Sequence, residues 1–351
     1  MVSNRCTLSQ SQPVTGSRSR AIRASRASRE RPGLREAPSS SYMGIRITAG
    51  ARPVSAAIRA IAAWRAGARR GGNMAESSSF SFTALYTGET WQASGLSLPE
   101  LRTPAGDVMY RLLGPAEWAA NAVFGTNLRQ SLVARHALID RLVIGHLQDW
   151  PDAQILEIAC GLSARGCRFA RQFPELRYVE ADLPAMAANK ARALARIPGR
   201  SRRHEVVPID ILAPSGPHAL ETVLTGYFDR TRPLIVITEG LMNYFPRPVA
   251  THVWRRLAEA LRGFPCAGYV METYPAPKPR LLRAVAGAGA AALRLISRSH
   301  AGIHFRTADQ AARHLSGAGF AEVDVVWPAE NALLCVLDCR TGTARVAGQG
   351  G

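Results

Sequence analysis

The sequence contains no pair of cysteines spaced as CxxC, although six cysteines occur among its 351 residues. Most of the six lie in apolar segments, so we predict neither a disulfide framework nor a metal site, and a reducing, cytoplasmic compartment fits best.

Long hydrophobic runs are also missing. The longest in the C-terminal third, residues 284–293, is closed by an arginine on each side and is too short to span a bilayer. We therefore expect no contact with a membrane, and the N-terminus lacks the apolar core of a signal peptide.

Acidic residues are scarce in the first 73 residues, where Glu30 and Glu36 stand against fourteen arginines and no lysine. This segment carries a charge of +12, which leaves +6 of the total +18 for the rest of the chain. The high charge is therefore mainly a property of the first 73 residues. We do not expect the folded part to bind nucleic acid.

Three interpretations of residues 1–73 stay open. The composition is typical of a disordered basic tail and also of an organelle transit peptide. Arginine outnumbers lysine 42 to 2, which indicates a GC-rich coding sequence, and spurious upstream reading frames in such genes are rich in arginine. On that third interpretation the start would be mis-assigned and Met74 would be the true first residue. We also expect residues 341–351 to be a disordered tail.

Residues 80–150 are predicted to form a mostly helical cap region. An opening loop that contains Trp91, Leu96 and Leu98 is expected to close at Pro99, and short amphipathic helices follow at Leu101–Leu113 and Ala116–Phe124. The strongest helical pattern covers Asn127–Leu147, where apolar residues recur with a period near 3.6.

From residue 151 to residue 340, buried strands alternate with helices, which predicts a doubly wound, Rossmann-like parallel sheet. The predicted strands are Ile155–Ala159, Arg177–Ala181, Glu205–Ile209, Leu234–Thr238, Gly268–Thr273, Ala321–Trp327 and Ala332–Asp338. The predicted helices are Ala164–Phe173, Pro184–Ala195, Arg247–Gly263, Lys278–Arg298 and Thr307–Ala318, with none between the third and fourth strands. The last two strands are joined by so few residues that only an antiparallel pair fits. We therefore expect an α/β fold with seven strands and a terminal antiparallel hairpin.

Two features after the first two strands predict a pocket for an adenosine. The first strand runs into a tight turn of small residues around Gly161, and the second ends on Asp182. Small residues let the backbone approach a ligand, and an acid at the end of the next strand accepts hydrogen bonds from ribose hydroxyls. The plainer alternatives are an ordinary strand-to-helix turn and, for Asp182, a helix N-cap.

Other candidate residues lie on or near these strands. Asp210 and Ile211 follow the third strand, where they suit the amine and the face of an adenine, or merely cap a loop. Glu157 lies inside an apolar strand, where a carboxylate is costly without partners, so we expect it to take loop N–H groups or a cationic end of the ligand.

Polar groups near the fourth strand are the remaining candidates. Glu239 ends that strand and is predicted to hold a cationic group of the ligand, while Tyr244 orients a substrate or is simply a core tyrosine. Arg135, on the strong helix, either clamps a carboxylate or is a solvated helix arginine. His300 and His304 flank a predicted lid and are weak candidates for a base.

Four motifs, in this order along the chain, resemble the leucine carboxyl methyltransferase-like group of S-adenosylmethionine-dependent methyltransferases, which includes bacterial polyketide O-methyltransferases. V-A-R is matched at residues 133–135. Residues 156–169 are similar to L-G-A-G-x-D-[ST]-R-x-x-R-[LF], but Ala159 stands for a glycine and Ser163 for the aspartate. Y-x-E-x-D-x-P is matched at residues 178–184, with Lys190 following as in the family. A-E-[GC]-x-[LM]-x-Y is matched by Glu239, Gly240, Met242 and Tyr244. The resemblance covers about residues 90–340.

This resemblance implies transfer of a methyl group from S-adenosylmethionine to an oxygen of a small molecule, a polyketide or another secondary metabolite. Such a displacement needs alignment more than acid–base chemistry. It implies that Arg135 holds the methionyl carboxylate, Asp182 the ribose, Asp210 and Ile211 the adenine, and Glu239 the methionyl amine or its water. An acceptor carboxylate needs no base, whereas a hydroxyl needs a histidine or glutamate from the lid.

Two other functions stay open. An NAD(P)-dependent oxidoreductase of the Rossmann type would have more glycine in the turn and no terminal antiparallel pair. A non-catalytic module would bind nucleic acid through its basic tail. The sequence indicates neither the acceptor nor the oligomeric state.

Overall fold

The computed structural model describes residues 82–124, 127–275, 303–329 and 333–342. The basic segment 1–73, the predicted helix Lys278–Arg298 and nearly all of the predicted C-terminal tail lie outside these residues. Among the described residues, no helix has both the length and the apolar character needed to cross a membrane.

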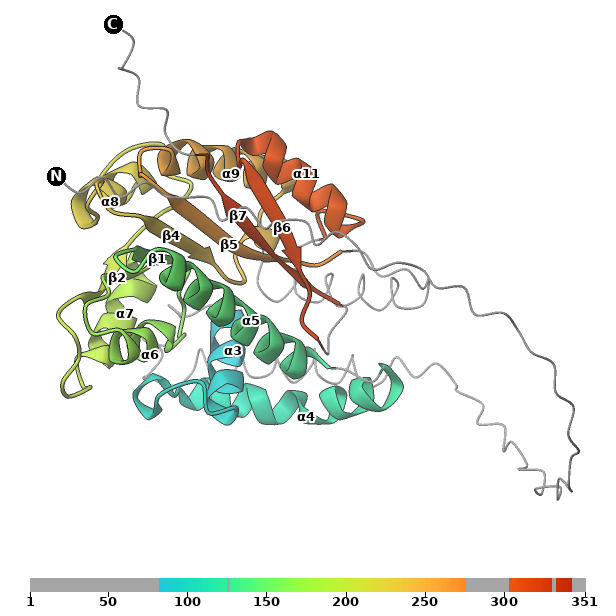
Figure 1. Ribbon diagram of the computed structural model, residues 1–351. Coiled ribbons are helices and arrows are strands. Elements are labelled where there is room, and N and C mark those ends of the chain that lie inside the picture. The colour runs from blue at the N-terminus through green and yellow to red at the C-terminus, as the bar shows by residue number, and fades with distance from the viewer. Residues whose placement is uncertain (1–81, 125–126, 276–302, 330–332, 343–351) are drawn as a thin grey trace, which may run out of the picture. The chain divides into compact units, whose positions relative to one another are not determined.

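One mixed sheet organises the chain (Figure 1). Its strands are β1 (Gln154–Ile158), β2 (Tyr178–Asp182), β3 (His204–Pro208), β4 (Leu234–Thr238), β5 (Ala267–Thr273), β6 (Glu322–Val326) and β7 (Cys335–Arg340). The order is β3-β2-β1-β4-β5-β7-β6, in which β1 to β5 are parallel and β7 runs antiparallel to both of its neighbours. The predicted seven-stranded sheet with a terminal antiparallel hairpin is confirmed, and each predicted strand overlaps an observed one.

Helices cover both faces of this sheet, because its central strands are apolar on both sides. Strands β1 and β4 are buried along their whole length. One face packs on α8 (Leu220–Tyr227), α9 (Arg247–Leu261) and α11 (Ala308–Ala318), around the fully buried Trp254. The other face packs on α5 (Leu128–Asp149) and α6 (Arg165–Gln172), and α7 (Pro184–Leu194) lies on the same side (Figure 1).

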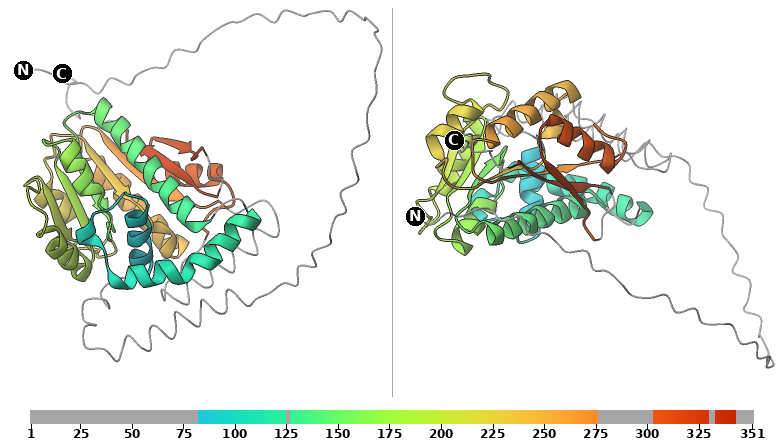
Figure 2. Two further views of the ribbon diagram at one scale, coloured as in Figure 1. Left: turned by 90° about the horizontal axis from the view of Figure 1, so that it is seen from below. Right: turned by 45° about the horizontal axis from the view of Figure 1, so that its top comes forward.

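The N-terminal helices differ from the prediction in two places. Trp91, expected in the opening loop, lies instead in helix α3 (Phe82–Ala93), which buries Leu85, Tyr86 and Trp91, and the loop begins after Ala93. The two short helices expected on either side of Pro115 are a single helix, α4 (Pro104–Phe124). Figure 2 shows α3 and α4 on the α5 side of the sheet. Packing of the buried aromatic and aliphatic side chains outweighs the weak helical periodicity of α3.

A third difference is α8, which lies in the connection between β3 and β4 where no helix was predicted. It has only eight residues, three of which, Leu220, Val223 and Leu224, enter the core. Helix α5 agrees with its prediction, and Asn127 begins it with a capping box: its side chain accepts from the N–H of Gln130, whose own side chain accepts from the N–H of Asn127.

Candidate functional site

The turn after β1 is joined directly to the acid at the end of β2. The N–H of Gly161 donates to Oδ2 of Asp182 at 2.8 Å, and the N–H of Leu183 donates to Oδ1 at 2.8 Å. Burial raises the pKa of Asp182, and the two N–H groups oppose that effect. Asp182 therefore does not cap α7, as its plainer interpretation suggested, because no side chain caps that helix.

Two residues of this turn have a left-handed backbone: Ala159 at φ 58° and Gly161 at φ 48°. The turn is also covered closely by α3. A Cβ on Gly88 of α3 would lie 3.0 Å from the Cβ of Leu162, so the missing side chain allows the helix to approach the turn. Ser163 occupies the position of the family aspartate, and its Oγ accepts the N–H of Arg165 at the start of α6.

The residues after β3 lie beside Asp182, because the N–H of Ile209 donates to the carbonyl of Asp182 at 2.8 Å. Oδ1 of Asp210 accepts the N–H of Leu212, as expected for a loop cap, and Ile211 packs into the core. The exposed apolar side chains here are Leu183 and Leu212, at 57% and 45% exposure. Neither leucine was singled out from the sequence. The contacts of Asp210 and Ile211 with an adenine stay predictions.

Arg135 is held in place by groups from β4 and from the end of β5. Its side chain is only 5% exposed, its Nε donates to Oε1 of Glu239 at 2.8 Å, and its Nη1 donates to the Tyr274 hydroxyl at 2.8 Å. A solvated helix arginine is therefore excluded. Within the described residues Nη2 makes no hydrogen bond, and it passes close to Gly240, whose left-handed turn follows β4.

Arg165 links carboxylates from three elements. It donates to Glu157 of β1 at 2.6 Å, to Glu239 at the end of β4 at 2.6 Å and to Asp140 of α5 at 2.5 Å. The second oxygen of Glu157 accepts the Tyr178 hydroxyl at 2.7 Å. Both oxygens of Glu157 therefore accept from side chains, and not from the loop N–H groups or the ligand end that the sequence suggested.

The charge on Glu239 is stabilised by neighbouring cations and a histidine. Burial by itself would raise the pKa of this carboxyl, but His136, Arg165 and Arg135 hold it well below 4.5. Nε2 of His136 lies 2.6 Å from Nη2 of Arg168, which can only donate, so Nε2 accepts. Nδ1 of His136 lies 2.8 Å from Oε2 of Glu239 and also 2.8 Å from Nη2 of Arg165, so both ring nitrogens face an arginine. The sequence assigned no role to His136 or Arg165, although one follows Arg135 directly and the other lies in the turn motif.

The candidate bases are already hydrogen-bonded. The Tyr244 hydroxyl donates to Oγ1 of Thr83 in α3 at 2.8 Å, and burial raises its pKa, so it stays protonated at neutral pH. Nε2 of His304 donates to the Phe245 carbonyl at 2.9 Å, and His300 lies outside the described residues. No group of three or more metal-ligating side chains comes together in the part of the chain that the structure describes.

Comparisons with known proteins support the resemblance of these motifs to a family. Residues 104–258 match the family model described as leucine carboxyl methyltransferase, which confirms the resemblance, and S-adenosylmethionine is the cofactor of that family. No protein of curated function matches the chain.

The chain is also similar to solved structures, of which the first named here shows the same fold. A candidate methyltransferase from Thermobifida fusca YX shares 17% identity at a TM-score of 0.50, covering 75% of this chain and 96% of the other. A candidate O-methyltransferase from Nostoc punctiforme PCC 73102 (14%, TM-score 0.43) covers 61% and 58%. Human N-acetylserotonin methyltransferase, solved with S-adenosylmethionine (14%, TM-score 0.41), covers 81% and 67%. This chain thus spans little more than half of the Nostoc protein.

The left-handed backbone at Ala159 predicts that Ala159→Gly stabilises the protein. A side chain at such a φ costs about 1–2 kcal/mol, and the greater freedom of an unfolded glycine offsets about 0.5–1 kcal/mol of the gain. We expect a net rise of about 0.5–1 kcal/mol in the free energy of unfolding, measured by urea denaturation. Ala188→Gly, on the exposed side of α7, is the control and should lower that free energy by up to about 1 kcal/mol. A loss at both positions would contradict the prediction.

The carboxylates around Arg165 predict a pH-dependent effect of Arg165→Met. At neutral pH the variant leaves buried carboxylates without their cation and should lower the free energy of unfolding by about 3–5 kcal/mol. The pKa of Glu239 is depressed, so its stabilising contribution is complete above about pH 4.5 and is lost as the pH falls below that value. The difference between wild type and variant should therefore shrink in acid. The exposed Arg141→Met on α5 is the control, and a difference independent of pH would refute this account.

Proposed function

Because residues 104–258 match leucine carboxyl methyltransferases, we propose that the chain is an S-adenosylmethionine-dependent methyltransferase that acts on an oxygen of a small molecule. The observation that carries this proposal is the direct link between the turn after β1 and Asp182. It places an acid beside a turn whose backbone a ligand can approach closely. Both lie at the carboxyl edge of the sheet, where open α/β sheets bind their ligands.

The residues at this edge fit an adenosine. Each carboxylate oxygen of Asp182 accepts one N–H, so each keeps a lone pair for a ribose hydroxyl. The exposed Leu183 adjoins this acid and offers an apolar surface to a base. The dinucleotide alternative gains no support here, because the turn has a single glycine and the sheet ends in an antiparallel pair.

The other end of the cofactor fits Arg135. Glu239 and Tyr274 fix the guanidinium through Nε and Nη1, which leaves Nη2 for a methionyl carboxylate. Both oxygens of Glu239 already accept hydrogen bonds, so Glu239 acts first by orienting Arg135. Its own contact with the methionyl amine stays a prediction.

The state of the candidate bases favours a carboxylate as acceptor. S-adenosylmethionine supplies an activated methyl group, and an ionised carboxylate attacks it without losing a proton. Among the described residues, Tyr244 is hydrogen-bonded to Thr83 and His304 to the Phe245 carbonyl. Neither side chain is therefore available as a free base. A hydroxyl acceptor is the alternative, with a base from the lid. Tyr244, tied to α3, would then serve to position the acceptor.

The acceptor class is tested by the stability of the product. The chain is incubated with methyl-labelled S-adenosylmethionine and a panel of small carboxylic acids and phenols, each a polyketide-like compound. A methyl ester releases labelled methanol in mild base, whereas a methyl ether does not. Ester products support the proposal; ethers alone would assign a hydroxyl acceptor, and labelled nitrogen or carbon products would refute O-methylation.

Asp182→Ala should weaken the binding of S-adenosylhomocysteine by about 1–3 kcal/mol, or about 10- to 100-fold, because two ribose hydrogen bonds and the Gly161 contact are lost. Isothermal titration calorimetry measures the change. Asp152→Ala, an exposed aspartate after α5, is the matched control and should bind normally. Equal affinity of Asp182→Ala and wild type would count against the assignment.

Arg135→Ala should weaken the same binding more severely than Arg135→Lys does. Lysine keeps the positive charge but loses the fork that reaches Glu239, Tyr274 and the ligand together. Arg141→Ala, exposed on the same helix, is the control, and thermal unfolding of each variant shows whether it is folded. If folded Arg135→Ala binds as wild type does, the methionyl contact is wrong.

A further inference from the structure

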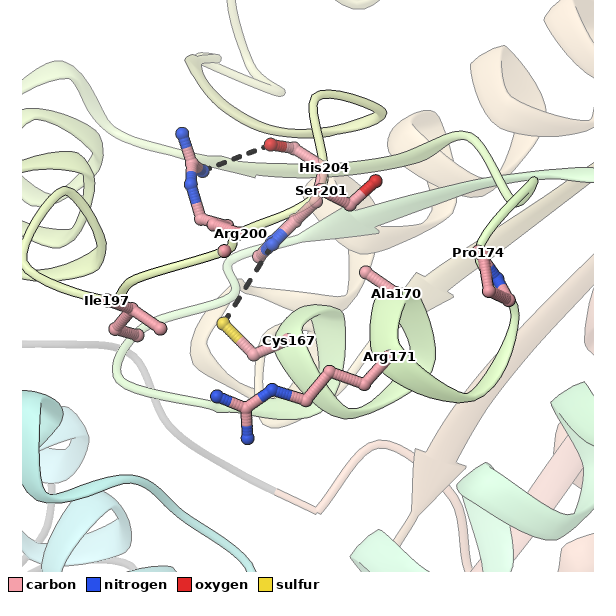
Figure 3. Close-up of a pocket in the computed structure, with 9 residues that line it drawn as sticks. Cys167, Ala170, Arg171, Pro174, Ile197, Arg200, Ser201 and His204 are labelled. Carbon is pink, nitrogen blue, oxygen red and sulfur yellow. Dashed lines mark hydrogen bonds between the residues drawn. The ribbon is translucent and has the colours of Figure 1, made fainter.

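Figure 3 shows a pocket whose lining includes none of the residues assigned to the cofactor. Its volume is about 280 Å³, and it is formed by α6 and by the segment that leads into β3. His204, the first residue of β3, lines it, whereas Asp182 and Asp210 lie at or beyond the opposite ends of β2 and β3. The pocket therefore opens near the amino ends of these parallel strands and does not belong to the cofactor edge.

The lining of this pocket is positively charged. Arg171 and Arg200 both line it, and no acidic residue does. Arg171 forms no ion pair with the described residues, and Arg200 donates only to the backbone carbonyl of His204 at 3.0 Å. In contrast, Arg177 and Arg203, which directly precede β2 and β3, pair with glutamates. Two guanidinium groups without carboxylates create a site that attracts an anion.

The floor of the pocket is polar and fixed. His204 has no exposed surface; its Nε2 lies 3.2 Å from Oε2 of Glu180, and its Nδ1 lies 3.9 Å from Sγ of Cys167. Glu180 in turn pairs with Lys190 at 2.9 Å. A Cβ on Gly166 would lie 2.5 Å from Nε2 of His204, so the glycine is what allows the imidazole to pack under α6. The imidazole at the floor of the pocket is therefore enclosed by α6 and by these buried side chains.

A hydroxyl adds a further donor. Oγ of Ser201 accepts the N–H of Arg203 at 3.1 Å, which leaves its own O–H hydrogen to donate. The lining thus combines two guanidinium groups with a hydroxyl, next to the apolar side chain of Ile197. Guanidinium groups match the oxygens of phosphate in bidentate geometry. The volume lies near the lower limit of small-molecule sites.

We propose that this pocket is a second binding site, which takes a small ligand carrying a phosphate group between Arg171 and Arg200. Neither guanidinium belongs to the proposed methyl-transfer machinery. Binding here does not require S-adenosylmethionine, so the proposal stands or fails independently of the proposed function.

The test is isothermal titration calorimetry of the full chain with inorganic phosphate at low ionic strength. We expect saturable binding that weakens about 10-fold or more in Arg171→Ala and in Arg200→Ala, because each removes a charged hydrogen-bond donor. Arg171→Lys should retain part of the affinity. The control is Arg202→Ala, which removes the same charge from an exposed side chain two residues from Arg200 and should change the affinity less than 2-fold.

Three results would overturn the proposal. The first is the absence of saturable binding. The second is an equal loss in Arg202→Ala, since general attraction to the basic surface would then explain the binding. The third is unchanged binding in folded Arg171→Ala and Arg200→Ala, which would assign the phosphate to another basic part of the chain, such as residues 1–73. Circular dichroism and thermal unfolding establish that each variant is folded.

Discussion

The positive charge of Arg165 is the feature on which the central part of the structure depends. Its guanidinium is fully buried and contacts carboxylates of β1, β4 and α5, so three elements far apart in the sequence share one cation. A buried carboxylate without such a partner would destabilise the fold by several kcal/mol. The alignment of α5 with the sheet is therefore fixed by charge as well as by packing.

The same network prepares the proposed cofactor site. Glu239 accepts from Arg165 and from Arg135, and Arg135 is the arginine assigned to the methionyl carboxylate. The guanidinium of Arg135 is thus already oriented by Glu239 before a ligand group binds to it, which reduces the entropy lost on binding. Asp182, the last residue of β2, is held by hydrogen bonds from the N–H groups of Gly161 and Leu183. Methyl transfer by displacement depends on this kind of alignment.

The two ends of the parallel strands offer different chemistry. At the carboxyl ends, Asp182 presents a carboxylate beside backbone N–H groups, and Glu239 orients the guanidinium of Arg135, which suits a ligand with several polar groups. Near the amino ends of β2 and β3, Arg171 and Arg200 line a pocket without an acid. A link exists between the two ends, because Lys190 contacts both Glu180 and the Cys160 carbonyl of the turn.

The sequence by itself indicated the seven strands, the terminal hairpin and the resemblance to a family, because hydrophobic periodicity and turn motifs are local signals. It also identified Asp182 and Arg135 as candidates. Only the tertiary structure showed that Glu157 pairs with Arg165, that His136 lies against Glu239, and that Trp91 belongs to a helix and not to the opening loop. These outcomes depend on partners from 8 to 103 residues away along the chain and on packing that no local pattern encodes.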